Sequence, residues 1–311
     1  TDLDAFNAGD YSRAQKANND AEAITCLLYP DDNTPAGQQL RLQQEYFFVC
    51  AGLQSMLRTF RATHLPWDKL PERVAIHTND THPALCVPEL MRLLMDGEGL
   101  SWEEAWDITC RTISYTNHTI MAEALEKWPM DYLLDVVPHL VPIIEKLDEK
   151  IKAKYPQENV AIIDKNNLVH MAHMDIHYGF SINGVAALHT EILKTSELKA
   201  FYDIYPEKFN NKTNGITFRR WLMHCNHPLT DYITSLIGDE FKTNATALEN
   251  LLKYKDDETV LNKLLEIKTE AKKTCKEFIL SNTGVEINEN SIYDIPVSYT
   301  HLRAHETRHD L

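Results

Sequence analysis

The strongest constraint in this sequence is one long helical stripe of apolar residues. Between Leu40 and Thr63 apolar side chains recur every three or four residues, as at Leu42, Tyr46 and Val49. That spacing is typical of a helix with one buried face. With 43% hydrophobic residues, the chain also has enough apolar material for a sizeable core around such a helix.

Further helical segments alternate with a few short strand-like runs. Ser101 and Glu104 have the spacing of a capping box, which predicts a helix from there to about Arg111. The apolar run 74–76 is bounded by polar residues and predicts a short buried strand, while residues 122–127 are expected to be helical. This alternation predicts an α/β fold with helix-rich additions.

Two polar loops follow the predicted strands. One covers residues 77–83, and the other covers residues 115–119. Ligands of open α/β folds bind outside the carboxyl ends of the strands, and both loops are dense in groups that hydrogen-bond hydroxyls. We expect a carboxylate such as Asp80 to be able to orient an imidazole such as His118. The alternative is that both are ordinary turns, which Asn, Asp and Thr also favour.

A histidine cluster offers a different chemistry. His170, His173 and His177 are spaced by three and four residues, so they can share a helix face and bind a metal. The H-E-x-x-H arrangement of zinc proteases is missing. A metal-dependent hydrolase is therefore the minor alternative, and histidines packed within the fold, with no metal, are the expectation.

A fourth segment, residues 212–221, combines a flexible turn with positive charge. Gly215 permits a tight turn, Asn214 offers a donor and an acceptor, and Arg219 with Arg220 could meet a phosphate. A loop followed by an ordinary amphipathic helix explains the same pattern.

Composition excludes some classes of protein. The formal net charge of -15 argues against a nucleic-acid partner, which needs a basic face. Six scattered cysteines without a C-x-x-C pair indicate reduced thiols in a reducing compartment. No apolar run approaches the roughly 18 residues that cross a bilayer. We therefore expect a cytoplasmic protein with no membrane partner, and the start at Thr1, inside a helical pattern, suggests a missing upstream portion.

Read in order, these segments resemble the α-1,4-glucan (glycogen or maltodextrin) phosphorylases. Any one matching run is weak, but their common order over residues 1 to about 295 is specific. The matching runs are Phe6-Asn7-Ala8-Gly9-Asp10-Tyr11, Leu28-Tyr29-Pro30, Leu40-Arg41-Leu42-Gln43-Gln44-Glu45-Tyr46-Phe47, Asn79-Asp80-Thr81-His82-Pro83-Ala84-Leu85, Pro88-Glu89-Leu90-Met91-Arg92, Tyr115-Thr116-Asn117-His118-Thr119, Glu123-Ala124-Leu125-Glu126-Lys127-Trp128-Pro129, Asn183-Gly184-Val185-Ala186, Lys208-Phe209, Asn211-Lys212-Thr213-Asn214-Gly215-Ile216-Thr217 and Arg219-Arg220-Trp221-Leu222.

The resemblance implies a glycosyltransferase of two Rossmann-like domains (the GT-B type) that depends on pyridoxal 5'-phosphate. Such an enzyme moves a terminal glucosyl unit from an α-1,4-glucan onto inorganic phosphate and releases glucose 1-phosphate. The phosphate group of the cofactor serves as proton donor and acceptor, while the protein supplies orientation and electrostatics. A homodimeric parent protein is also implied.

Five residues take family roles by their place in these runs. Asn33 falls on the loop that gates the substrate, and His118 falls on a histidine that hydrogen-bonds a glucose hydroxyl. Asp80 falls on the acidic residue near that histidine, and Asn214 on a second asparagine that contacts glucose. Trp221 falls on a tryptophan close to the cofactor phosphate.

The resemblance also implies a division of the chain. Residues 1–209 correspond to the later part of an N-terminal domain, and residues 210–295 to the start of the cofactor domain. Residues 296–311 match no family segment that we can trace, so we expect a non-native tail. The lysine that attaches pyridoxal phosphate is expected downstream of this break, so the alternative for the 311 residues alone is a non-catalytic interaction or structural fragment.

Overall fold

A computed structural model describes residues 1–121, 125–215 and 217–293 of the chain. The chain divides into two compact units, Thr1–Lys212 and Thr213–Leu311. Each unit has its own apolar core.

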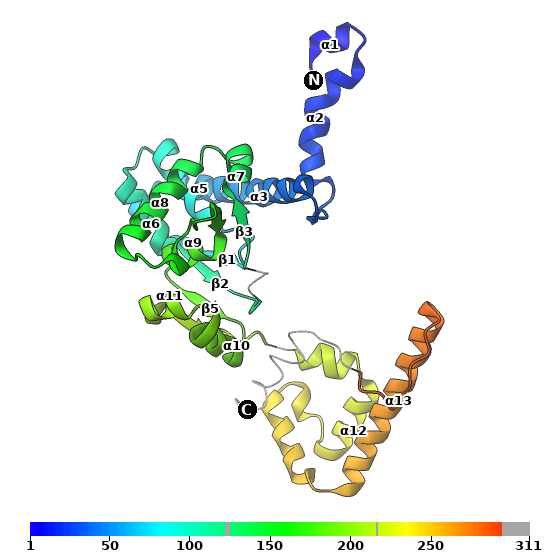
Figure 1. Cartoon of the computed structure of the whole chain (residues 1–311). Helices are drawn as coiled ribbons and strands as arrows, with labels where there is room; N and C mark the ends of the chain where they lie inside the picture. Colours follow the sequence, from blue (N-terminus) through cyan, green and yellow to red (C-terminus); the bar gives the residue numbers. More distant parts are fainter. Residues whose placement is uncertain (122–124, 216, 294–311) are drawn as a thin grey trace. The chain divides into compact units, whose positions relative to one another are not determined.

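The first unit is built on a four-stranded parallel sheet (Figure 1). Its strands are β1 (Ile76–Asn79), β2 (Ile113–Thr116), β5 (Ile182–Gly184) and β6 (Phe209–Asn211), which lie side by side in that order. All four residues of β2 are buried, as expected for a central strand of a parallel sheet. A separate antiparallel pair joins β3 (Lys127–Pro129) to β4 (Leu168–His170).

Within its described residues, eleven α-helices make the first unit helix-rich. They are α1 (Leu3–Asn7), α2 (Tyr11–Cys26), α3 (Pro35–Arg61), α4 (Leu70–Arg73), α5 (Cys86–Arg92), α6 (Trp102–Thr112), α7 (Met130–Val136), α8 (Val141–Lys154), α9 (Met171–Tyr178), α10 (Ala187–Ile192) and α11 (Lys199–Ile204). Short 3-10 or π-helical turns follow or link them at Trp67–Lys69, Leu93–Gly97, Glu158–Val160, Leu193–Glu197 and Pro206–Lys208. The expected helix-rich α/β class is therefore confirmed, with a parallel sheet at its centre.

The predicted stripe forms the buried face of α3. Leu42, Val49, Leu53 and Leu57 are all buried in the large core that α3 shares with α5, α6, α8 and α9. Burial of one leucine side chain contributes about 1.5–3 kcal/mol, so this face anchors α3 firmly. The helix begins earlier than predicted because Thr34 accepts the backbone N–H of Gly37 and caps it.

The capping box at the start of α6 is confirmed in both directions. The backbone N–H of Glu104 donates to Ser101 Oγ at 3.3 Å, and the backbone N–H of Ser101 donates to the Glu104 carboxylate at 2.9 Å. The helix then runs to Thr112, one residue beyond the predicted end.

The placement of β1 corrects the sequence prediction. The strand covers Ile76–Asn79 rather than 74–76, so residues 77–79 of the segment expected to be a loop are extended and paired with β2. Its buried residue is Thr78, whose hydroxyl donates to the Ser114 carbonyl at 3.1 Å. Cross-strand pairing stabilises this polar strand, and an apolar run alone could not reveal it. The helix expected over residues 122–127 lies partly outside the described residues, and Lys127 belongs to β3.

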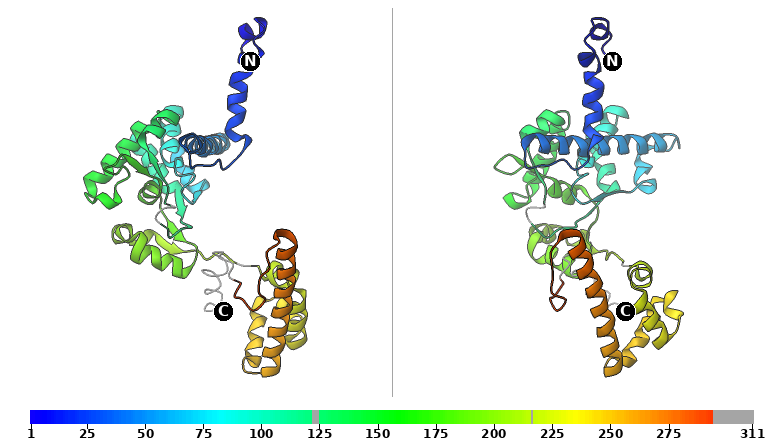
Figure 2. Two further views of the ribbon diagram at one scale, coloured as in Figure 1. Left: turned by 45° about the vertical axis from the view of Figure 1, so that its right-hand side comes forward. Right: turned by 90° about the vertical axis from the view of Figure 1, so that its right-hand side faces the viewer.

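The second unit consists of helices and helical turns. A π-helical turn (Arg219–His224) leads into α12 (His227–Ile237), and 3-10 turns (Glu240–Lys242 and Ala245–Tyr254) lead to the long α13 (Glu258–Thr283). Ile233, Phe241 and Ala247 form its small core, and α13, drawn in orange, lies against α12 (Figure 2). Within the described residues of both units, no helix has the length and apolarity to cross a membrane.

The three histidines of the suggested metal cluster take part in packing. His173 Nδ1 donates to the Ala161 carbonyl at 2.6 Å, and His177 Nε2 donates to the Val160 carbonyl at 2.7 Å. His170 Nε2 instead lies 2.9 Å from the Asp164 carboxylate. Their nitrogens therefore point to three different partners, and the described residues contain no group of three ligands that could hold a metal ion. The geometry gives the hydrolase alternative no support.

Burial of these rings predicts acid sensitivity of the first unit. Burial lowers the pKa of His173 to about 3 and that of His177 to about 4. The unfolded chain takes up these protons near pH 6.5, so their contribution to stability is present above pH 6.5 and is lost as the pH falls below it. Between pH 7.5 and pH 5 we expect the free energy of unfolding to fall less in His177→Gln than in the wild type, by on the order of 1–2 kcal/mol.

Urea unfolding at the two pH values, followed by tryptophan fluorescence, measures this difference. The matched control is His64→Gln, because His64 is exposed. An unchanged pH dependence in His177→Gln would contradict the assignment of the acid sensitivity to this buried ring.

Candidate functional site

A polar hydrogen-bond network crosses the sheet near the carboxyl ends of its strands. His77 on β1 contacts two hydroxyls of β2: its Nδ1 lies 2.6 Å from Ser114 Oγ, and its Nε2 bonds Thr116 Oγ1. Thr116 Oγ1 in turn donates to Asn183 Oδ1 on β5 at 2.7 Å. Because the Thr116 proton goes to Asn183, Nε2 of His77 carries a hydrogen and donates to Thr116 Oγ1. Burial, together with the nearby His118, lowers the pKa of His77 and favours the neutral ring.

The network continues into the loop after β2. The backbone N–H of Asn117 donates to the Asn183 carbonyl at 2.9 Å, and Asn117 Nδ2 donates to the Tyr115 hydroxyl at 3.0 Å. Asn117 Oδ1 accepts the backbone N–H of Thr119 at 3.0 Å. Asn117 is fully buried, whereas the next residue, His118, is exposed. Buried Asn117 therefore fixes the loop, and His118 beside it is exposed to solvent.

Asp80 and His118 follow β1 and β2, which are neighbouring strands. Asp80 has a positive φ of 67°, and its backbone N–H donates to the Thr116 carbonyl at 2.9 Å. Aspartate tolerates this left-handed conformation better than most residues. His118 Nε2 donates to Asn79 Oδ1 at 2.6 Å.

A cavity of about 570 Å³ opens beside Asp80. Its walls include Asp32 from the loop before α3, Arg41 from α3, and Glu126 and Trp128 from the segment that enters β3. Asn33, the neighbour of Asp32, is exposed, and its side chain donates to Asp31 Oδ1 at 2.6 Å. The structure thus brings the Asn33 loop and Asp80 to one cavity.

Two further residues predicted from the sequence lie in the second unit. Asn214 is half-buried near its start, and Trp221 is 61% exposed in the π-helical turn. Arg219 and Arg220, considered for phosphate, are also exposed. All four residues belong to the second unit.

Sequence reasoning missed the residues that hold the turn after β5. Buried His189 accepts the backbone N–H of Val185 on Nδ1 at 3.1 Å, and its Nε2 lies 3.2 Å from the Thr119 carbonyl. This one ring ties the turn after β5 to the loop that carries His118. The available signal was Gly184 at a strand end, since a glycine there often marks close backbone approach.

Gly184 allows a contact that no larger residue could make. A Cβ added there would lie 2.4 Å from Thr190 Oγ1 and 3.0 Å from Thr190 Cα. Thr190 Oγ1 also donates to Asn211 Oδ1 on β6 at 3.1 Å. A side chain at this position would therefore push α10 away from the edge of the sheet.

We expect Gly184→Ala to destabilise the first unit by about 1–3 kcal/mol through overpacking. The matched control is Gly52→Ala in the exposed part of α3, where an added Cβ meets nothing within 4 Å. That change should stabilise the helix by about 0.5–1 kcal/mol. Urea unfolding of both variants measures the difference, and equal effects would show that the close approach of Thr190 is unimportant.

Comparison with known proteins agrees with this architecture. The family model for carbohydrate phosphorylases matches residues 1–308. The chain is 52% identical over 281 residues to the maltodextrin phosphorylase of Streptococcus pneumoniae, an alignment that covers 90% of this chain and 37% of that protein. It is 43% identical over 313 residues to the glycogen phosphorylase of Bacillus subtilis, covering 96% of this chain and 39% of that protein. It is 40% identical over 318 residues to the muscle form of glycogen phosphorylase from Homo sapiens, covering 96% of this chain and 38% of that protein.

The chain therefore belongs to the carbohydrate phosphorylase family. The resemblance drawn from the ordered sequence runs is confirmed, and the family match extends past residue 295, to which those runs were traced. The chain spans between 37% and 39% of the length of these three relatives.

Proposed function

We propose that these residues belong to a glucan phosphorylase. The whole protein would move a terminal glucosyl unit from an α-1,4-glucan onto inorganic phosphate and release glucose 1-phosphate. The observation that carries this proposal, beside family membership, is the neutral network at the carboxyl edge of the sheet. Its hydroxyl, amide and imidazole groups are the partners that sugar hydroxyls require, and a buried polar site of this kind discriminates strongly for such groups.

Individual roles follow from position. His118 is exposed at the end of β2 and anchored through Asn79, so we assign it a hydrogen bond to a glucose hydroxyl. Asp80 and Asn33 would contact sugar from the cavity beside β1. Asn214 would contact glucose, and Trp221 would lie near the cofactor phosphate. Preorganised polar groups of this kind stabilise charge that develops during the reaction.

The domain division is also part of the proposal. Residues 1–209 would complete an N-terminal Rossmann-like domain, and residues 210–295 would begin a second one, as in a GT-B glycosyltransferase. The division between the two units after Lys212 supports such a boundary. The non-native origin expected for residues 296–311 stays a prediction, because residues 294–311 lie outside the described part of the chain. A cytoplasmic homodimer is the proposed state of the whole protein.

Pyridoxal phosphate is the proposed cofactor, but Lys208, the one described lysine whose pKa is lowered, fits its attachment poorly. A lysine that forms a Schiff base needs a lowered pKa and a free amine. Burial lowers the pKa of Lys208 to about 8, yet its Nζ donates to the carbonyls of Ile176 and His177 at 3.0 and 2.9 Å. Lys208 therefore holds the end of α9 instead. We propose that the attachment lysine belongs to a part of the protein outside these 311 residues.

A non-catalytic fragment remains the second candidate for the chain by itself. The observation that favours it is the share of the relatives' length that the chain spans, at most 39% in the three comparisons above. Such a fragment would keep the sugar-binding edge without completing the reaction.

The test is binding and turnover by the purified 311-residue chain. We expect measurable maltoheptaose binding by calorimetry, weakened about tenfold in His118→Ala, since one hydrogen bond contributes about 0.5–1.5 kcal/mol. His64→Ala is the control. With added pyridoxal phosphate and phosphate we expect no release of glucose 1-phosphate.

Two results would overturn parts of this proposal. Binding that is unchanged by His118→Ala would remove His118 from the sugar site. Release of glucose 1-phosphate would mean that the chain itself holds a complete cofactor site.

A further inference from the structure

One arginine of α3 joins three carboxylates from three separate segments. Arg41 Nη1 lies 3.0 Å from Asp32 in the loop before α3, and Nη2 lies 3.0 Å from Glu126 before β3. Its Nε lies 3.2 Å from Glu45, one turn further along α3. The planar guanidinium can bond several oxygens at once in fixed directions, which lysine cannot do.

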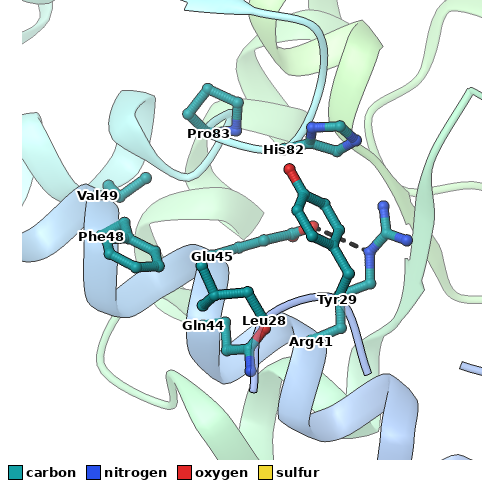
Figure 3. Close-up of a pocket in the computed structure, with 9 residues that line it drawn as sticks. All are labelled: Leu28, Tyr29, Arg41, Gln44, Glu45, Phe48, Val49, His82 and Pro83. Carbon is teal, nitrogen blue, oxygen red and sulfur yellow. Dashed lines mark hydrogen bonds and ion pairs between the residues drawn. The ribbon is translucent and has the colours of Figure 1, made fainter. Parts of the chain in front are cut away.

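Arg41 lines two cavities. One is the 570 Å³ cavity that is also lined by Asp80. The other is a smaller, mainly apolar cavity of about 340 Å³ with Tyr29, Phe48 and Pro83 among its walls (Figure 3). Glu45 also faces this second cavity, and Figure 3 shows its bond to Arg41 as a dashed line. Arg41 thus stands where the loop, the helix and the edge of the sheet meet.

The three acids differ in burial. The Glu45 and Glu126 side chains are each 11% exposed, whereas that of Asp32 is 50% exposed. Burial and the neighbouring Glu126 raise the pKa of Glu45 to about 9. This shift favours the protonated form of Glu45 at neutral pH.

The loop itself has few other attachments. Tyr29 is 79% exposed and has a positive φ of 56°, which is unfavourable for a tyrosine. Gln38 Nε2 donates to the Asp32 carbonyl at 3.0 Å and supplies a second tie. The backbone N–H and the side-chain amide of Asn33 both donate to Asp31 within the same loop. The ion pair to Arg41 is thus the charged link between this loop and the buried acids.

We propose that Arg41 is a positioning residue that holds the loop of residues 29–34 at the rim of the cavity beside Asp80. By fixing Asp32 it fixes the adjacent Asn33, for which sugar contact is proposed. Glu126 and the protonated Glu45 hold the guanidinium, and Asp32 is its outer, more exposed partner. This inference rests on the proposed function only for the sugar contact, because the attachment of the loop can be tested without sugar.

The Glu45 proton has a signature in pH-dependent stability. The folded chain keeps the Glu45 proton up to about pH 9, whereas the unfolded chain loses it near pH 4.5. The free energy of unfolding of the wild type therefore falls as the pH rises between these values. Glu45→Gln cannot titrate, so its free energy of unfolding should rise relative to that of the wild type over that range. If the difference between the two proteins is the same at pH 5 and pH 8.5, the protonated form of Glu45 is overturned.

Hydrogen exchange of the peptide covering residues 27–40 tests the attachment of the loop. We expect Arg41→Gln and Asp32→Asn to exchange about three- to tenfold faster than the wild type, which is the range of one partly exposed ion pair. Arg111→Gln is the matched control and should exchange like the wild type over this peptide, because it removes an exposed ion pair within α6 instead. Unchanged exchange in both Arg41→Gln and Asp32→Asn would overturn the proposal.

A double-mutant cycle separates positioning from general structural damage. If Arg41 acts through Asn33, Arg41→Gln should weaken maltoheptaose binding in the wild-type background and have little further effect in Asn33→Ala. An equal loss in both backgrounds would show a merely structural role and overturn the positioning claim. If the wild-type chain binds no maltoheptaose, the proposed function fails for these residues, while the exchange result still decides whether Arg41 holds the loop.

Discussion

A strand that is fully buried and yet carries hydroxyl groups must satisfy those groups across the sheet. β2 is such a strand: Ser114 and Thr116 are both buried, and each finds its partner on a neighbouring strand. A buried hydroxyl without a partner costs about 1–3 kcal/mol, so a shift of register would be strongly unfavourable. The bonds from His77 and to Asn183 therefore hold β1, β2 and β5 in register and set where each strand ends.

That register places the chemistry of the site. Once the strands end together, the residues that follow them are forced to one edge, with Asn117 buried as an anchor and His118 exposed beside it. His189 ties the next turn to the same loop. The edge is largely neutral, and the charged groups stand at its rim, where Arg41 meets its acids. A neutral interior with a charged rim is consistent with the uncharged, hydroxyl-rich ligand that we propose for this edge.

The sequence predicted what depends on local pattern. The α3 stripe and the capping box at Ser101 follow from spacing within a few residues. The two polar loops begin later than predicted, because β1 ends at Asn79 and β2 ends at Thr116. The sequence failed where partners are distant. β1 was placed two residues early, because Thr78 is stabilised by β2 and not by its own apolar character. For the histidines of α9 the spacing left a metal site open as the minor alternative, because their carbonyl partners at Val160 and Ala161 cannot be read from the sequence.

The contacts of Arg41 show the same limit at the candidate site. Asp32 and Glu45 are near it in sequence, but Glu126 comes from a different part of the chain, and only the fold brings the three acids together. The resemblance to phosphorylases assigned a role to Asn33 without indicating what holds its loop. Chemistry that arises from distant charges therefore becomes visible only in the structure.

We propose that the carboxyl edge of the β1-β2-β5-β6 sheet binds sugar. A crystal structure of this chain with maltoheptaose tests this directly. We expect glucose hydroxyls within hydrogen-bond distance of His118 and Asp80. An oligosaccharide bound elsewhere, such as on the outer faces of α6 and α8, with the edge left empty would contradict it.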